Sequence, residues 1–346
     1  MKRITLGRTD IEVSDWCLGT MTYGEQTGPE DAFAQMDMAL DAGIDFFDTA
    51  EAYPVNPMSA ETAGRTEEII GDWLVARGNR DSVKIATKAA GDTMTVRKGE
   101  GFSGENLASV LDGNLTRLKT DYIDLYQLHW PMRGSYMFRQ NWTFDPSGQD
   151  SNEVRDHMAG VLEALDKAVK AGKVRAVGLS NESAWGTMRW LQMAEEMGAP
   201  RMATMQNEYS LLCRLYDTDM AELSHHEDVT LFSFSPLAAG LLTGKYRGGV
   251  VPDGSRLAIN GTLGGRHQPR AHAAVDAYAE IAERHGMALD HMAMAFQRSR
   301  PYGVSAIFGA TTAAQLEHLL QGADLELSDE VLAEIDTAHR AHPMPY

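Results

Sequence analysis

Apolar residues along the chain follow two patterns that alternate. Short apolar runs of about four to eight residues, typical of buried strands, are separated by longer segments in which apolar residues recur every three or four positions, as on one face of a helix. An opening hairpin is predicted from Arg3 to Leu6 and Ile11 to Val13, with its turn at Gly7–Asp10. The strand-like runs after it are residues 16–21, 45–48, 83–87, 123–128, 174–179, 202–206, 229–235 and 304–308.

Helical patterns follow these strands in turn. We expect Ser103 to cap the third helix and Gly172 to end the fourth as a C′ glycine. The alternation predicts an α/β fold, a (β/α)8 TIM barrel with an N-terminal β-hairpin that plugs its closed end. No linker divides the chain, so a single domain over residues 1–346 is expected. The predicted helices are 32–42, 67–77, 103–118, 153–171, 188–196, 219–225, 271–285, 290–298, 312–321 and 329–339.

The chain is strongly acidic. Its 31 Lys and Arg against 49 Asp and Glu give a formal charge of -18, which disfavours nucleic acid and anionic membranes and favours small-molecule partners. Residues Met1–Thr5 contain no apolar signal core, and no segment offers the roughly 18 apolar residues of a membrane span. Cys17 and Cys213 stand in no disulfide or metal-ligand spacing. We expect a cytoplasmic protein, and its oligomeric state stays open.

Chemically useful residues stand where several predicted strands end. Asp48 ends the second strand and Tyr53 lies on the loop that follows it, Lys88 follows the third strand, and His129 with Trp130 follows the fourth. The carboxyl ends of the strands in a parallel barrel share one rim, where the loops converge over an open face. The pattern therefore predicts a proton-donating site on that rim.

Two long irregular segments interrupt the alternation. The first, residues 132–152, follows His129 and carries aromatic residues that either line a pocket or pack the loop onto the protein. The second, residues 244–269, is rich in Gly and basic residues, and either clamps a phosphate group or is a solvated surface loop. The aromatic residues are Tyr136, Phe138, Trp142 and Phe144, and the basic residues at the second segment are Lys245, Arg247, Arg256, Arg266 and Arg270.

Motifs at these strand ends resemble those of the aldo-keto reductase superfamily, in order along essentially the whole chain. They are Phe47–Ala50 with Tyr53, Ala86–Lys88, Leu128–Pro131, Gly178–Asn181, Met205–Ser210, Ser233–Leu237 and Gly240–Tyr246. Three further segments, Leu179–Glu182, Gly309–Thr312 and Leu327–His339, are most similar to the bacterial Tas-like branch. The resemblance implies an oxidoreductase that reduces aldehydes and ketones reversibly with NADPH and holds no metal.

The resemblance also implies a role for each residue of the rim. Tyr53 donates the proton to the carbonyl oxygen, and His129 donates a hydrogen bond to the same atom. A phenol with a pKa near 10 is a weak acid, so we expect Lys88 to lower the pKa of Tyr53 and Asp48 to keep Lys88 charged. Tyr53, His129 and Trp130 form the substrate pocket.

Other positions match the family's residues for the NADPH/NADP+ cofactor. Asn181 and Gln206 are expected at the nicotinamide carboxamide with Ser180 beside them, Phe234 on the nicotinamide ring, and Lys245 and Arg256 over the pyrophosphate. His318-Leu319 departs from the Glu-Asn that relatives often carry at the adenine, and no Gly-x-Gly-x-x-Gly fingerprint is present. The remaining predicted cofactor contacts are Gly19, Thr20, Met21, Asp48, Ser235, Pro236, Leu237, Ala239, Gly240, Gly309, Thr311 and Gln315.

Two other classes of function stay open. A barrel metallohydrolase also places Asp and His on its rim, but no His-x-His or His-x-x-x-His pair stands at a strand end and Lys88 disfavours a cation there. A regulatory subunit that binds the nucleotide with little turnover is the second alternative. The complete set of four polar residues on the rim favours the enzyme.

Overall fold

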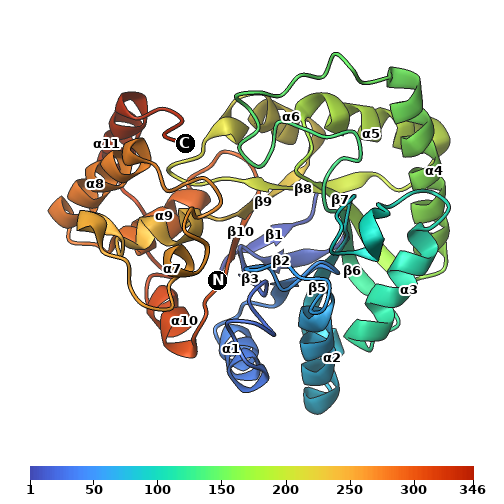
Figure 1. Cartoon of the computed structure of the whole chain (residues 1–346), viewed down its shortest axis with the longest axis horizontal. Helices are drawn as coiled ribbons and strands as arrows, with labels where there is room; N and C mark the ends of the chain where they lie inside the picture. The colour runs from blue at the N-terminus through green and yellow to red at the C-terminus, as the bar shows by residue number, and fades with distance from the viewer.

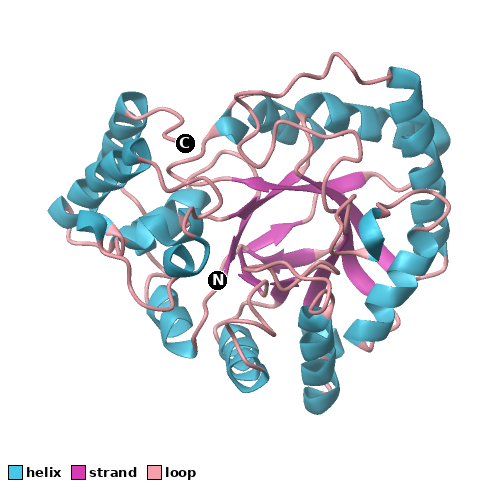
Figure 2. Cartoon of the chain, viewed as in Figure 1, coloured by secondary structure: helices cyan, strands magenta, loops and turns pink.

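A computed structural model describes all 346 residues. Eight parallel strands close into a barrel in the order β10-β3-β4-β5-β6-β7-β8-β9, and helices surround them (Figures 1 and 2). A separate antiparallel pair, β1 and β2, precedes the barrel. The predicted (β/α)8 barrel with its N-terminal hairpin is confirmed. The strands are β1 Arg3–Thr5, β2 Glu12–Ser14, β3 Trp16–Gly19, β4 Phe46–Asp48, β5 Lys84–Ala89, β6 Ile123–Leu128, β7 Val174–Ser180, β8 Met202–Glu208, β9 Thr230–Phe234 and β10 Val304–Phe308.

Helices form the outer layer, and the C-terminal ones gather on one side of the barrel (Figure 1). Their apolar faces join one large core with the outward side chains of the strands. No helix has the length and apolar character needed to cross a membrane. The helices are α1 Pro29–Asp41, α2 Arg65–Arg77, α3 Leu107–Leu118, α4 Ser151–Lys170, α5 Ala184–Met197, α6 Asp219–Glu227, α7 Arg256–Asn260, α8 Pro269–Arg284, α9 Leu289–Arg298, α10 Ala313–Leu320 and α11 Asp329–Ala341.

Two local predictions concern helix ends, and one helix was not predicted. Gly172 follows α4 with φ +74°, a left-handed conformation that glycine adopts without strain, as predicted. The prediction that Ser103 caps α3 was wrong, because its side chain accepts a hydrogen bond from the N–H of Asn106, in the turn before the helix. The short helix α7 was missed, since its few residues in a Gly-rich segment give no helical period.

Inside the barrel, side chains change from apolar to polar along the strands. Successive strand residues point to opposite faces, so residues two apart share the interior. Phe46 and Leu125 belong to the interior apolar cluster near the amino ends of their strands. Asp48 and Gln127, two residues later on the same strands, are buried and polar. The polar layer therefore lies at the carboxyl end of the barrel, where the catalytic residues were predicted.

The hairpin closes the opposite end of the barrel. Leu6, Ile11 and Val13 are fully buried or nearly so and pack with the interior apolar cluster, which includes Phe46 and Phe232. The two phenylalanine rings meet edge to face with centroids 4.9 Å apart. The interior at the amino end is thus filled by an apolar cluster, whereas the polar layer around Asp48 faces the carboxyl end.

Candidate active site

A buried ion pair lies at the centre of the polar layer. The Lys88 ammonium on β5 lies 2.7 Å from Oδ2 of Asp48 on β4, and neither side chain has more than 2% of its surface exposed. Lys88 Nζ also donates to the carbonyl of Thr49 at 2.7 Å and to the hydroxyl of Tyr53 at 3.5 Å. Burial lowers the pKa of Lys88, but Asp48 and Tyr53 outweigh this effect and hold the pKa above its usual value. Lys88 is thus a fixed cation whose third contact is the phenol.

Tyr53 stands on the loop after β4, above this cation. Its ring lies 4.8 Å from Lys88 Nζ and meets the His129 ring edge-on with centroids 5.8 Å apart. Burial raises the pKa of Tyr53, and Lys88 lowers it by a smaller amount, so the pKa lies above 10. Lys88 thus lowers the pKa of Tyr53 as expected, but the loss of water around the phenolate is the larger effect. Tyr53 keeps its proton at neutral pH.

His129 follows β6 and faces the same opening. It is buried, and both burial and the neighbouring Lys88 hold its pKa well below the usual value. The imidazole is therefore neutral at neutral pH, with one N–H to donate. Its Nδ1 has no hydrogen-bond partner, while its ring packs on Trp130 with centroids 4.7 Å apart. Asp48, Tyr53, Lys88, His129 and Trp130 thus lie together, as the positions at the strand ends suggest.

Two glutamines complete the layer. Gln206 on β8 donates from Nε2 to Oδ1 of Asp48 at 2.8 Å, and Gln127 on β6 donates to the same atom at 3.5 Å. The register places Gln127 beside Lys88. Sequence reasoning missed Gln127, although it precedes His129 by two positions and so shares the interior face. Gln206 was expected at the cofactor, and its amide group supports Asp48 as well.

Buried polar groups next to His129 leave one acceptor unused. Asn181, which has φ +56°, donates from Nδ2 to the carbonyl of His129 at 2.9 Å and to Ser180 Oγ at 3.0 Å. Ser180 Oγ in turn donates to the carbonyl of Gln206. Oδ1 of Asn181 is buried and has no partner. A buried amide oxygen normally accepts a hydrogen bond, so this atom fits the carboxamide NH2 of a nicotinamide.

The loop after β9 has an unusual backbone. Ser235, Ala238, Ala239 and Gly240 all have positive φ, between 48° and 94°. Non-glycine residues adopt this conformation rarely, and clusters of it form concave turns whose N–H groups bind anions. A Cβ at Gly240 would lie 3.2 Å from Lys245 Nζ, so this cation is close to the turn. The turn, with Pro236 and Leu237 inside it and Phe234 half-buried before it, fits a pyrophosphate.

The basic residues of segment 244–269 divide into two groups. Arg247 pairs with Asp276 and Glu283 on α8, and Arg266 is buried against Glu208. Lys245 and Arg256 form no ion pair. Burial, together with the nearby Arg266, lowers the pKa of Arg256 to about 10. Arg270 also forms no ion pair, but it lies over the Trp142 ring, so Lys245 and Arg256 remain the candidates for the pyrophosphate.

Strands β3 and β10 meet at the other side of the opening. Gly19 and Gly309 allow their backbones to approach closely, since a Cβ at Gly309 would lie 2.7 Å from the Gly19 carbonyl. Thr20 Oγ1 donates to the carbonyl of Asp48, and the carbonyl of Met21 accepts from the backbone N–H of residue 55. Thr311 donates to Oε1 of Gln315 on α10, where an adenosine phosphate was expected. These groups line the rim beside Asp48 and the first turn of α10.

The aromatic residues of segment 132–152 do not act as one wall. Phe138 packs edge-on against Trp130 with centroids 6.3 Å apart, next to the site. Tyr136 and Phe144 pack on each other, while Trp142 is exposed and contacts the Arg270 guanidinium. Only Phe138 touches Trp130, and the others secure the loop to itself and to α8.

Comparison with known proteins gives the family. Residues 16–340 match the aldo/keto reductase family. The chain belongs to this family. It is 41% identical over 344 residues to "Protein tas" of Escherichia coli, with 97% of both chains covered. It is 32% identical to the "Uncharacterized oxidoreductase YrpG" of Bacillus subtilis, over 96% of this chain and 94% of the relative. It is 28% identical to the "Norsolorinic acid reductase stcV" of Emericella nidulans, over 94% of this chain and 78% of the relative.

The family assignment supports an oxidoreductase of the aldo-keto reductase kind, which reduces carbonyl groups with NAD(P)H. It confirms the resemblance seen in the strand-end motifs, including the Tas-like branch. The roles of individual residues come from the geometry described above.

Proposed function

We propose that the protein reduces aldehydes and ketones to alcohols with NADPH, reversibly, and that Tyr53 donates the proton. The contact between the Tyr53 hydroxyl and the buried Lys88–Asp48 pair carries this proposal. A phenol that is protonated at neutral pH and touches a permanent cation can release a proton and be stabilised as phenolate.

The roles of the residues follow from their positions. A bound NADPH supplies the hydride to the carbonyl carbon. Tyr53 protonates the oxygen as negative charge develops on it, and Lys88 stabilises the phenolate that remains. Asp48 keeps Lys88 charged and directed at the phenol, while neutral His129 donates its N–H to the substrate oxygen and orients the carbonyl. Trp130 and Phe138 cover one side of the bound substrate.

The cofactor would be held by groups that have no partner of their own. Asn181 Oδ1 would accept from the carboxamide, the turn at 235–240 would bind the pyrophosphate, and Lys245 and Arg256 would neutralise its charge. The first turn of α10, with Gln315, is favourable for the adenosine phosphate because a helix N-terminus attracts anions. NADH and NADPH share the pyrophosphate, so a preference for NADPH depends on contacts with its additional adenosine phosphate at α10.

Replacement of Tyr53 by Phe tests the proposal. The variant keeps the ring and loses the acid, so turnover with a reactive aryl aldehyde should fall by about 10²–10⁴-fold or more. NADPH binding, followed by nicotinamide fluorescence, should be nearly unchanged. Tyr122→Phe is the matched control, since its hydroxyl contacts Asp81 on the surface.

The same assay separates the enzyme from a regulatory subunit that only binds the nucleotide. Cofactor binding by the wild-type protein without turnover of any carbonyl compound would support the regulatory alternative. Activity of Tyr53→Phe within a few-fold of wild type would show that another group donates the proton.

A further inference from the structure

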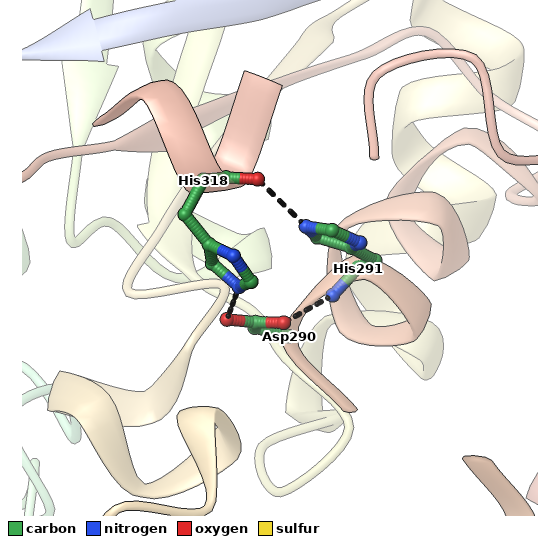
Figure 3. Close-up of side chains that lie close together, drawn as sticks. All are labelled: Asp290, His291 and His318. Carbon is green, nitrogen blue, oxygen red and sulfur yellow. Dashed lines mark hydrogen bonds and ion pairs between the residues drawn. The ribbon is translucent and has the colours of Figure 1, made fainter. Parts of the chain in front are cut away.

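One cluster of metal-ligating side chains lies outside the candidate active site. Asp290 and His291 are consecutive residues at the start of α9, and His318 lies on α10 (Figure 3). Their potential ligand atoms all lie within 4.8 Å of one another. His318 is the residue at which the chain departs from the family pattern, so the cluster gives a structural context for that departure.

Hydrogen bonds hold the three side chains in place. Oδ2 of Asp290 lies 2.9 Å from Nε2 of His318, and its Oδ1 accepts from the backbone N–H of His291 at 2.9 Å. Nε2 of His291 donates to the backbone carbonyl of His318 at 2.8 Å (Figure 3). The two imidazole rings are stacked, with centroids 4.7 Å apart and an angle of 27° between their planes. The cluster thus joins α9 to α10.

Packing further restricts the cluster before any ion binds. Asp290 is buried, with 6% of its surface exposed, although it is a charged residue at a helix end. His291 lies close to Gly322, since a Cβ added to this glycine would lie 2.6 Å from Cδ2 of the ring. His318 is exposed and can adjust. Packing therefore confines Asp290 and His291, whereas the exposed side chain of His318 is held by its contact with Asp290.

We propose that Asp290, His291 and His318 form a binding site for a divalent transition metal ion, with Zn²⁺ as the best match. Two imidazole nitrogens and one carboxylate oxygen are a ligand set that Zn²⁺ binds, with water in the fourth position. In such a site the ligands lie about 2.0–2.2 Å from the ion. The present separations require an adjustment mainly of the exposed His318.

The chemistry of the ligands also excludes the hard cations. Ca²⁺ and Mg²⁺ take oxygen ligands, and only one carboxylate is present here. Imidazole ligands suit Zn²⁺, Ni²⁺, Cu²⁺ and Co²⁺. In the metal-free protein, the bond from His291 Nε2–H to the His318 carbonyl holds this nitrogen toward the other two residues. Nδ1 of His291 lies on the side of the ring away from Asp290 and His318, so a bound ion would take Nε2 in place of the His318 carbonyl (Figure 3).

Zn²⁺ titration of the metal-free protein against a fluorescent zinc chelator tests the proposal. The wild-type protein should bind one Zn²⁺ ion tightly per chain. His291→Ala and His318→Ala should each weaken this binding by at least about tenfold, since even second-shell changes weaken metal sites by 10–100-fold. Asp290→Asn keeps the size of the side chain and should weaken binding similarly. Co²⁺ in place of Zn²⁺ should give a visible d–d absorption spectrum in wild type alone.

Two other histidine pairs supply matched controls. His225 and His226 lie side by side on α6, and His267 and His272 lie 2.9 Å apart at the start of α8. His225→Ala and His272→Ala should leave the tight binding unchanged. Equal losses in these controls, or wild-type affinity in His291→Ala or Asp290→Asn, would overturn the proposal. Circular dichroism without metal confirms that each variant is folded, and none of these readouts depends on carbonyl reduction.

Discussion

Replacing Asp48 by Asn should strongly destabilise the folded protein. The change removes the only negative charge in contact with the Lys88 ammonium, while the amide oxygen of Asn can still accept from Gln206. Lys88 then stays buried with only the Thr49 carbonyl and the Tyr53 hydroxyl as partners. Neither partner carries a compensating charge. The variant therefore tests whether the centre of the site is held together by the ion pair.

The distance between Lys88 and Asp48 gives the expected size of the destabilisation. At 2.7 Å and an effective dielectric constant of 20, the attraction between two unit charges is about 6 kcal/mol. Part of it offsets the loss of hydration of both groups, and removing one partner of a buried pair typically costs about 3–5 kcal/mol. We expect a loss of this size in the free energy of unfolding of Asp48→Asn, and a similar loss in Lys88→Met.

The double variant measures the interaction between Asp48 and Lys88 separately from the contacts that each residue makes with other groups. Asp48→Asn with Lys88→Met leaves no unpaired charge, so its loss should be well below the sum of the two single losses. We expect a coupling free energy of about 2 kcal/mol or more. Urea unfolding, followed by tryptophan fluorescence and by far-UV circular dichroism, measures all four proteins, and agreement of the two probes checks for a two-state transition.

Additive losses would refute the reasoning. If the double variant loses as much as the two single variants together, within about 0.5 kcal/mol, the two charges do not stabilise each other. Wild-type stability of Asp48→Asn would also contradict it, because the Lys88 ammonium would then be hydrated or uncharged in the folded protein.

Three further predictions concern the cofactor, pH and substrate size. Lys245→Met or Arg256→Ala should weaken NADPH binding by about 1–3 kcal/mol each, measured by nicotinamide fluorescence, with little change in turnover at saturating cofactor. Unchanged affinity of the double variant would show that segment 244–269 is a solvated surface loop. Burial lowers the pKa of His129 in the folded protein, so the unfolded chain binds the proton first and the free energy of unfolding falls as the pH drops below about 6.5. His129→Gln should reduce this dependence on pH, measured by urea unfolding across pH 5–8. Phe138→Ala should raise the KM for aryl aldehydes much more than for very small ones, whereas exposed Trp142→Ala should change neither; equal responses would place segment 132–152 away from the pocket.

The fold was predictable from the sequence because each strand carries its own local signal. Apolar runs bounded by turn residues identified all eight barrel strands, and the order β3 to β10 follows from the alternation with helices. Helix ends were harder to predict. Ser103 has the residue type of a cap, but its hydrogen bond with Asn106 forms a turn before α3, and residue type alone does not distinguish the two positions.

The polar residues of the site were predictable from their positions, and their energetics were not. Strand ends bring Asp48, Lys88 and His129 to one rim in any parallel barrel. The direction of the pKa change at Tyr53 depends instead on how much water the folded chain excludes, compared with the field of Lys88. The sequence indicates the effect of Lys88 but not the extent of burial, so the net rise in the pKa of Tyr53 was not predictable from it.

The basic segment shows the same limit for ligand binding. Five basic residues near one another in a Gly-rich stretch suggest an anion site, but only unpaired charge is available to an anion. Arg247 and Arg266 are neutralised by acids that are distant in the sequence, on α8 and at the end of β8. Lys245, Arg256 and Arg270 lack such partners, and Arg270 packs on the Trp142 ring instead. Because an ion pair between distant segments forms only in the folded chain, the structure was needed to separate the cations that hold the loop from those that can hold the cofactor.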